Sequence, residues 1–295
     1  MATPTDQMLL DRIEALVRRR TETDRRMSYA WMIIPILPLA AGIAIVSSFL
    51  GILVSTLPKL STISQTNAQN TLTPVVGGLL ALYGFAVIVF FGVLFLGAVS
   101  FYYMIDRRNR HFSRQQLLFS TLHKYLSTKA PQSQSVAQVG FLAEDSSSQE
   151  GSRPAGLWAL LFMFVTPIIG LILSYCLTQD LHKHDQLQSK FQAALPPALA
   201  EVGYGQQNLP AYKARGGDPV LFIILSAITG GLFWVYWYFT LLRDYNGHFA
   251  DQARFEDQLL SVLVPPKVEK PCGTCGGAVP SGAKFCPNCG RAQTA

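Results

Sequence analysis

Residues 75–104 read VVGGLLALYGFAVIVFFGVLFLGAVSFYYM and carry no charged side chain. A helix needs about 20 predominantly apolar residues to cross a membrane, so this stretch is long enough. Residues 29–57, 155–177 and 220–242 are also uncharged and long enough. The apolar residues come in blocks rather than in alternation, which argues against a membrane barrel. Helices satisfy every backbone amide inside hydrocarbon, so we predict an all-α membrane protein with four transmembrane helices.

The composition supports this prediction. Hydrophobic residues make up 49% of the 295 residues and charged residues only 14%, which is too apolar for an ordinary soluble domain of this size. The net charge of +6 could indicate a nucleic-acid partner, but the basic residues follow the predicted membrane helices instead. We therefore expect the lipid bilayer as a partner and no nucleic acid.

Basic residues are concentrated before the first predicted helix, between the second and third, and after the fourth. They are Arg12, Arg18, Arg19, Arg20, Arg25, Arg26, Arg107, Arg108, Arg110, Arg114, Lys124, Lys129, Arg153, Arg243, Arg254, Lys267, Lys270, Lys284 and Arg291. The predicted outer loops carry Lys59 and, between residues 178 and 219, Lys183, Lys190, Lys213 and Arg215. Cytoplasmic loops carry an excess of Lys and Arg, so we predict a multi-pass protein of the cell membrane with both termini cytoplasmic. All four tryptophans fall near the predicted cytoplasmic helix ends, where indole rings prefer the interface: Trp31, Trp158, Trp234 and Trp237.

Residues 1–26 predict a cytoplasmic amphipathic helix. Thr3, Pro4 and Asp6 supply an N-cap, a first-turn proline and a capping-box acid. The apolar residues of one face are Leu9, Leu10, Ile13, Leu16 and Val17. That face could touch anionic lipid or pack on other cytoplasmic helices, and the sequence leaves both open. The segment is too polar and the first apolar stretch too long for a cleaved signal peptide.

A weak internal repeat follows the second and fourth predicted membrane helices. Residues 101–126 and 238–263 align without gaps and share six residues: Asn109/Asn246, His111/His248, Phe112/Phe249, Gln115/Gln252, Leu122/Leu259 and Leu126/Leu263. We therefore predict two parallel-repeat hairpins with cytoplasmic helical extensions, in residues 27–126 and 155–263. Residues 127–154, rich in Ser and Gln, predict a flexible cytoplasmic linker, and residues 264–271 a second linker.

Four cysteines in residues 272–291 form the strongest chemical signal of the chain. Cys272 and Cys275 make one pair and Cys286 and Cys289 the other, each with two residues between the cysteines and a glycine after them. Two such pairs can place four thiolates around one ion, which is typical of structural zinc sites. The segment resembles the short zinc ribbons at the ends of many prokaryotic membrane and regulatory proteins, and we predict a zinc ribbon with Zn²⁺ as the metal.

Other interpretations of the four cysteines remain open at this stage. Iron or redox-active thiols are alternatives to zinc, and a disulfide framework is disfavoured by the predicted cytoplasmic location. If all four metal positions are filled by protein, no position remains for a water, so a hydrolytic role is not expected. The ribbon would then be a folding staple or a protein-docking module.

The histidines are weaker candidates. His182 and His184 flank Lys183 in the predicted outer loop, and a divalent-metal site there is conceivable, although two solvated imidazoles usually have no such role. His111 and His248 occupy equivalent positions of the repeat, where they could form symmetric hydrogen bonds or simply cap and pack the helices.

Residues 228–238, ITGGLFWVYWY, followed by Leu242-Arg243-Asp244-Tyr245-Asn246, resemble a widespread family of uncharacterised prokaryotic membrane domains. Its members have a Thr-Gly turn, a Trp/Tyr-rich inner helix end and a polar helical tail, and they often carry a zinc ribbon. The resemblance covers the last predicted membrane helix best. It implies architecture and not an activity.

No constellation of catalytic side chains stands out in the sequence. We therefore expect a non-enzymatic membrane protein that serves as a scaffold or as a partner-docking or regulatory subunit, through its cytoplasmic helices and zinc ribbon. The expected partner is another protein or a second copy of the chain. The alternative is a channel or facilitator for a small solute, and an enzyme acting on lipid ranks third.

Overall fold

A computed structural model describes residues 3–60, 68–165, 168–210, 215, 217–264, 270–279, 285–286 and 288–292, without the side chains of residues 58–60, 68–72, 270 and 278. Within these residues the fold is all-helical apart from one very short strand pair. The helices are α1 Pro4–Arg18, α2 Arg20–Thr23, η1 Tyr29–Met32, α3 Ile33–Leu60, α4 Ala68–Lys129, α5 Gln134–Gln149, α6 Ala155–Phe164, α7 Ile168–Leu199, η2 Ala200–Tyr204, α8 Pro219–Ile228 and α9 Leu232–Leu263. Strands β1 Lys270–Pro271 and β2 Ala278–Val279 pair antiparallel.

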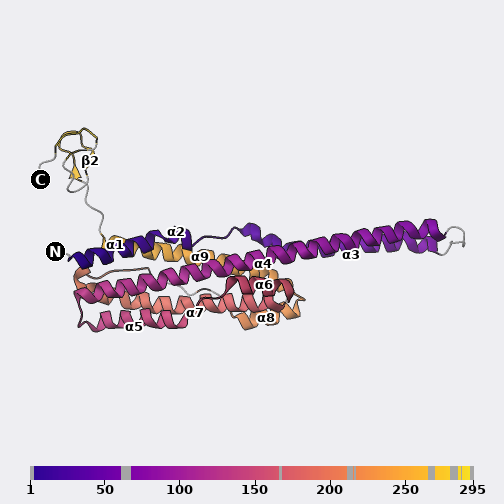
Figure 1. Ribbon diagram of the computed structural model, residues 1–295, viewed down its shortest axis with the longest axis horizontal. Coiled ribbons are helices and arrows are strands. Elements are labelled where there is room, and N and C mark those ends of the chain that lie inside the picture. Colours follow the sequence, from indigo (N-terminus) through magenta and orange to yellow (C-terminus); the bar gives the residue numbers. More distant parts are fainter. Residues whose placement is uncertain are drawn as a thin grey trace.

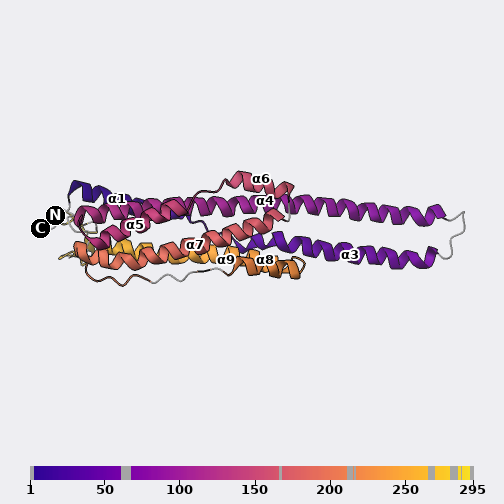
Figure 2. The ribbon, with the colours of Figure 1, turned by 90° about the horizontal axis from the view of Figure 1, so that it is seen from below.

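Helices α3 and α4 form a long hairpin that extends far beyond the other helices (Figures 1 and 2). They are the two described helices that are long and apolar enough to cross a membrane, over Tyr29–Leu57 and from Thr73 onward. Their apolar side chains face outward: Ile43 is 70% exposed, Ile88 73% and Phe91 63%. A soluble core helix would bury such side chains, so this surface suits contact with lipid tails.

The prediction of a third transmembrane helix is wrong, because residues 155–177 form two helices that run in opposite directions. Helix α6 ends at Phe164, and α7 starts at Ile168 and runs in the opposite direction (Figures 1 and 2). The Phe162 ring lies against Gly170 across this reversal. A proline at position 167 disfavours helix at the residue before it, which gives a physical reason for the break. At ten residues, α6 is about 15 Å long, which is half of a bilayer core.

The prediction of a fourth transmembrane helix is wrong for a similar reason. Helices α8 and α9 are joined by a tight turn in which Gly230 has φ 60° and Gly231 has φ 91°. Glycine adopts these left-handed conformations without the penalty that a Cβ brings. The rings of Phe222 and Phe233 then meet across the hairpin at 5.3 Å. Two short hairpins therefore lie beside α3 and α4 in place of two spanning helices (Figure 2).

The reversal of residues 155–177 moves the predicted outer loop into the main helical bundle. Phe191 and Leu195 of α7 share one buried core with Phe119 and Leu122 of α4, and the rings of Phe119 and Phe191 stack at 3.6 Å. Residues 178–199 therefore pack beside the end of α4, whereas the sequence had placed them across the membrane from it. Counting basic residues could not detect this, because the count assumed four crossings.

Two of the four tryptophans make contacts between helices. Trp237 is fully buried, and its indole N–H donates to Thr178 Oγ1 at 2.9 Å. Trp234, at the start of α9, donates to Ser174 Oγ at 3.1 Å. These two indoles join α9 to α7, so they do not mark the interface.

The predicted N-terminal helix is confirmed as α1. Thr3 and Asp6 form a reciprocal capping box, and the apolar face of the helix packs on α4 and α9. Leu10, Ile13 and Val17 are buried in the same core as the end of α4. Of the two interpretations that the sequence left open, packing against the protein's own helices is the one that the structure shows.

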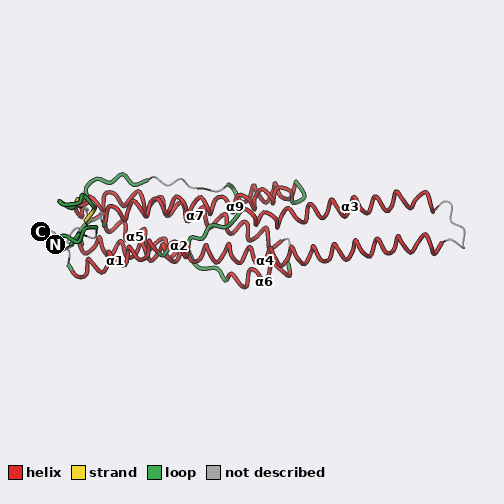
Figure 3. Tube along the Cα trace, turned by 90° about the horizontal axis from the view of Figure 1, so that it is seen from above, coloured by secondary structure: helices red, strands yellow, loops and turns green. Residues whose placement is uncertain are grey.

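Residues 127–154 do not form the expected flexible linker, because most of them belong to α5. Ser133 caps this helix by accepting from the Val136 N–H, and Val136, Val139 and Ala143 pack into the bundle. Helix α5 lies along α4 and α7 (Figure 3). The second predicted linker, residues 264–271, falls mainly on residues 265–269, outside the described part of the chain.

Candidate metal centres

The four predicted cysteine ligands lie together at the C-terminal module. Cys272 Sγ is 3.7 Å from Cys289 Sγ, and Cys275 Sγ is 3.7 Å from Cys286 Sγ. All four sulfurs lie within 4.8 Å of one another. Metal–sulfur distances of about 2.3 Å would place tetrahedral sulfurs about 3.8 Å apart, so the spacing fits a four-thiolate metal site. A disulfide needs a bond of about 2 Å, which these distances exclude.

The two cysteine pairs have the same backbone geometry. Gly276 N donates to Cys272 O at 2.9 Å, and Gly290 N donates to Cys286 O at 2.8 Å. Both glycines have φ 70°, which a residue with a Cβ rarely adopts. The glycine after each pair therefore lets the chain turn tightly and bring two sulfurs to one point, as the spacing predicted. With four protein ligands, such a metal has a structural role and no open position.

A second cluster lies in the bundle, where three histidines from three different helices meet. His111 of α4, His184 of α7 and His248 of α9 are each at most 1% exposed. Their ring centroids form a nearly equilateral triangle with sides of 4.8, 4.9 and 5.3 Å. One ring nitrogen from each lies within 4.8 Å of the others. The sequence left open whether His111 and His248 form symmetric hydrogen bonds or only cap and pack the helices; their contact and the third member are findings of the structure.

Each imidazole has a carboxylate at its Nδ1 atom. His111 Nδ1 lies 3.0 Å from Asp24 Oδ1, His184 Nδ1 lies 2.6 Å from Glu150 Oε1, and His248 Nδ1 lies 2.9 Å from Asp185 Oδ1. Because a carboxylate lies at Nδ1 of each ring, the three Nε2 atoms are left for other partners. His111 Nε2 and His248 Nε2 are 2.9 Å apart.

Burial and the carboxylates set the charges of this cluster. Burial lowers the pKa of His111 to about 3 and also lowers the pKa of His248, so these two imidazoles are neutral near pH 7. Burial alone would raise the pKa of Asp24, but its interactions with His111 and Arg114 outweigh burial and lower it. Burial alone would also raise the pKa of Glu150, but its contacts with His184 outweigh burial and lower that pKa. A neutral His111 imidazole therefore faces an ionised Asp24 carboxylate.

The histidine helices follow a threefold repeat, which the twofold alignment captured only in part. His184, Gln188, Leu195 and Leu199 of α7 have the same spacing as His111, Gln115, Leu122 and Leu126 of α4 and as the matching residues of α9. Each of these helices also follows a hairpin turn. The shared His-x₃-Gln-x₆-Leu-x₃-Leu spacing was the signal that could have revealed the third copy.

The same repeat holds the three hairpins together through their backbones. Asn109 accepts from Arg153 N and donates to Arg153 O, just before α6. Asn246 does the same with Met27 N and O, just before η1 and α3. In α7 the equivalent residue is His182, whose Nδ1 lies 3.5 Å from Arg215 O, before α8. Each polar helix thus positions the start of the next hairpin, in a cyclic order.

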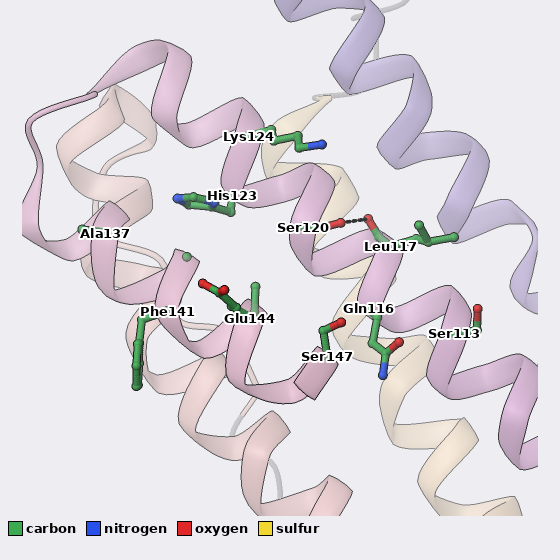
Figure 4. A pocket seen from close by; sticks show the side chains of 12 residues that line it. Ser113, Gln116, Leu117, Ser120, His123, Lys124, Ala137, Phe141, Glu144 and Ser147 are labelled. Carbon is green, nitrogen blue, oxygen red and sulfur yellow. Dashed lines mark hydrogen bonds between the residues drawn. The ribbon is translucent and has the colours of Figure 1, made fainter. Parts of the chain in front are cut away.

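A groove of about 760 Å³ between α4 and α5 is a third feature (Figure 4). Its charged or titratable lining residues are His123, Lys124 and Glu144. His123 packs over Gly140, where a Cβ would lie 2.4 Å from its Nε2 atom. The His123 ring already contacts Gly140, and its Nε2 atom lies 3.1 Å from Ser127 Oγ. The described lining residues do not bring several metal-binding groups to one point. The groove is therefore a weaker candidate site than the two clusters.

No family model, no curated protein and no solved structure matches this chain. The resemblance of residues 228–246 to uncharacterised membrane domains therefore stays a prediction.

Proposed function

We propose that the chain is a non-enzymatic membrane protein that holds a helical bundle at the cytoplasmic face and presents a zinc-stabilised module to a protein partner. Three features support this: the outward-facing apolar residues of α3 and α4, the four-thiolate cluster, and an exposed aromatic residue on the module. Zinc is the metal that a closed set of four thiolates favours.

The exposed aromatic residue is the observation that carries the docking proposal. Phe285 is 62% exposed, although its backbone is fixed by a bridge to Ala292 and by the neighbouring ligand Cys286. Arg291 is anchored to Thr274 Oγ1 on the other cysteine pair, at 3.0 Å. Rigid aromatic and arginine side chains are enriched among the residues that dominate protein interfaces. A metal-fixed turn that displays both is suited to docking.

The charge distribution supports a cytoplasmic bundle. With two crossings, α3 and α4 return the chain to the side on which it started. Arg25 and Arg26 precede α3, and Arg107, Arg108 and Arg110 follow the apolar part of α4. An excess of basic residues next to membrane helices favours the cytoplasmic side. The ribbon cysteines would then lie in a reducing compartment, where thiolates remain available for metal.

A photo-crosslinking amino acid at position 285 in the full-length chain, in living cells, tests the docking role. We expect a discrete adduct that mass spectrometry identifies and that disappears when Cys286→Ser removes a metal ligand. Phe141 is the matched control position, because it is an equally exposed phenylalanine (68%) on α5. An absence of adducts at position 285, or the same adducts at both positions, would contradict docking through the ribbon.

The channel or facilitator alternative gains no support from a specific feature of the described residues. Two helices cannot enclose a path for a solute, so several copies of α3 and α4 would have to assemble. Solute flux into liposomes that contain the purified protein, compared with empty liposomes, tests this alternative directly.

A further inference from the structure

We propose that His111, His184 and His248 bind one divalent transition-metal ion through their Nε2 atoms, at a second metal site that is independent of the cysteine cluster. The proposal does not depend on the docking role. Imidazole nitrogen suits zinc, copper, nickel and iron, and three histidines are a common ligand set for zinc with one position left open.

The direct contact between the His111 and His248 rings supports a shared metal ion. The hydrogen bond between His248 Nδ1 and Asp185, at 2.9 Å, favours a proton on Nδ1 and a lone pair on Nε2, and His111 Nδ1 likewise lies 3.0 Å from a carboxylate oxygen, Asp24 Oδ1. Their Nε2 atoms are nevertheless only 2.9 Å apart. With a proton on Nδ1 of both rings, the two Nε2 lone pairs would repel each other at that distance unless a cation lay between them. Tetrahedral coordination at about 2.05 Å would place two nitrogens about 3.3 Å apart, so a small movement would admit a metal.

The third histidine, His184, also supports a shared metal ion. His184 Nε2 is buried and has no hydrogen-bond partner among the described residues. Its ring is held in place by Glu150 on one nitrogen and by the parallel Phe112 ring at 4.0 Å. An unpaired nitrogen in a buried, fixed ring is costly unless a ligand satisfies it. A metal shared with the other two histidines would do so.

The carboxylates form the expected outer shell of such a site. Histidines that bind metals usually donate their other ring N–H to a carboxylate or a carbonyl, which fixes the ring and strengthens the ligand. His184 and His248 have that partner, in Glu150 and Asp185, and His111 Nδ1 lies 3.0 Å from Asp24 Oδ1. In addition, one ring nitrogen from each of the three histidines lies within 4.8 Å of the others, as a shared metal would require.

A layer of buried glutamines lies one helical turn away on the same helices. Gln115, Gln188 and Gln252 each follow a cluster histidine by four residues and are at most 1% exposed. Both amide atoms of Gln115 and of Gln188, and the Oε1 atom of Gln252, have no hydrogen-bond partner among the described residues. Such a polar layer is where water or an exogenous ligand on the open metal position would find hydrogen bonds.

The test uses the full-length chain with the four ribbon cysteines replaced by serine, purified in mild detergent. Elemental analysis measures the bound metal, and X-ray absorption identifies the ligand atoms. We expect about one metal ion per chain, held by nitrogen and oxygen ligands, after exposure to zinc. The outcome that overturns the proposal is a folded protein that retains no zinc, cobalt, nickel or copper at micromolar concentrations.

Two single variants in the same background locate the site. His184→Ala should abolish metal binding, whereas His182→Ala, two residues away in α7 and exposed, should preserve it. His184→Gln serves if the alanine variant does not fold, because it keeps a polar side chain of similar size. Circular dichroism and gel filtration verify that each variant is folded. Equal metal content in folded His184 and His182 variants would contradict the site.

Discussion

The Nε2 atoms of His111 and His248 lie 2.9 Å apart, although 137 positions separate the two residues in the chain. They occupy the same place in two related helices, and His184 completes the set from a third. This relationship shows that the bundle is built from three similar hairpins around a common centre. Its stability and its topology can be tested residue by residue.

The turn between α8 and α9 should depend on glycine. Gly231→Ala places a Cβ on a residue with φ 91°, and we expect a loss of about 1 to 2 kcal/mol, because L-residues are strained in left-handed conformations. Thermal unfolding in detergent measures the loss. Gly51→Ala in α3 is the control, since a Cβ added there would have nothing within 4 Å. Equal unfolding midpoints for both variants would contradict the strain argument.

The two asparagine contacts should be important for stability. Asn109→Ala and Asn246→Ala each remove two hydrogen bonds to a backbone at the start of a hairpin. We expect a loss of about 1 to 3 kcal/mol for each, because a backbone group is left without its partner. Ser148→Ala, exposed on α5, should have little effect and serves as the control. Unfolding midpoints within error of the control would show that water replaces these bonds.

The pH dependence of stability should include a contribution from Asp6. The hydrogen bond from Lys129 Nζ, at 2.6 Å, and the bonds with Thr3 lower the pKa of Asp6 below its usual value. A lowered pKa in the folded state means that the ionised carboxylate stabilises the protein above about pH 4 and that this stabilisation is lost as the pH falls further. Asp6→Asn should therefore lower the thermal midpoint near pH 7 and have a shrinking effect below about pH 4. A difference from the unmodified chain that does not change with pH would argue against this ion pair.

The side of the membrane that residues 178–210 occupy can be measured by labelling. In a background without native cysteines, Lys190→Cys in α7 and Lys124→Cys in α4 should both react with an impermeant reagent from the cytoplasmic side only. Both positions are exposed and belong to the same bundle. Labelling of the two positions from opposite sides would restore the four-crossing topology.

Metal removal should act on the C-terminal module. Cys286→Ser removes one of the four ligands, and we expect the loss of one zinc ion per chain, because a structural site of this kind rarely tolerates three ligands. Elemental analysis measures the loss, and Cys176→Ser, outside the cluster, is the control. An unchanged zinc content in Cys286→Ser would contradict the four-thiolate assignment.

Local signals in the sequence were sufficient for several elements. The capping box at Thr3 and Asp6 depends on residues three positions apart, and the cysteine pairs depend on spacing within 18 residues, so both were correctly predicted. The two long apolar helices were predicted for the same reason, because length and composition decide whether a helix suits lipid. In each case neighbouring residues fix the outcome.

Tertiary structure decided the rest. An uncharged stretch of about 20 residues fits one spanning helix or a hairpin of two short ones equally well. The reversals near Pro167 and at Gly230-Gly231 let α6 and α8 pack beside the long hairpin, and pattern and length alone cannot measure that packing. The histidine centre followed from these reversals. Only when α7 turns back does His184 reach His111 and His248, because its distance from them depends on the path of the whole chain and not on any local spacing.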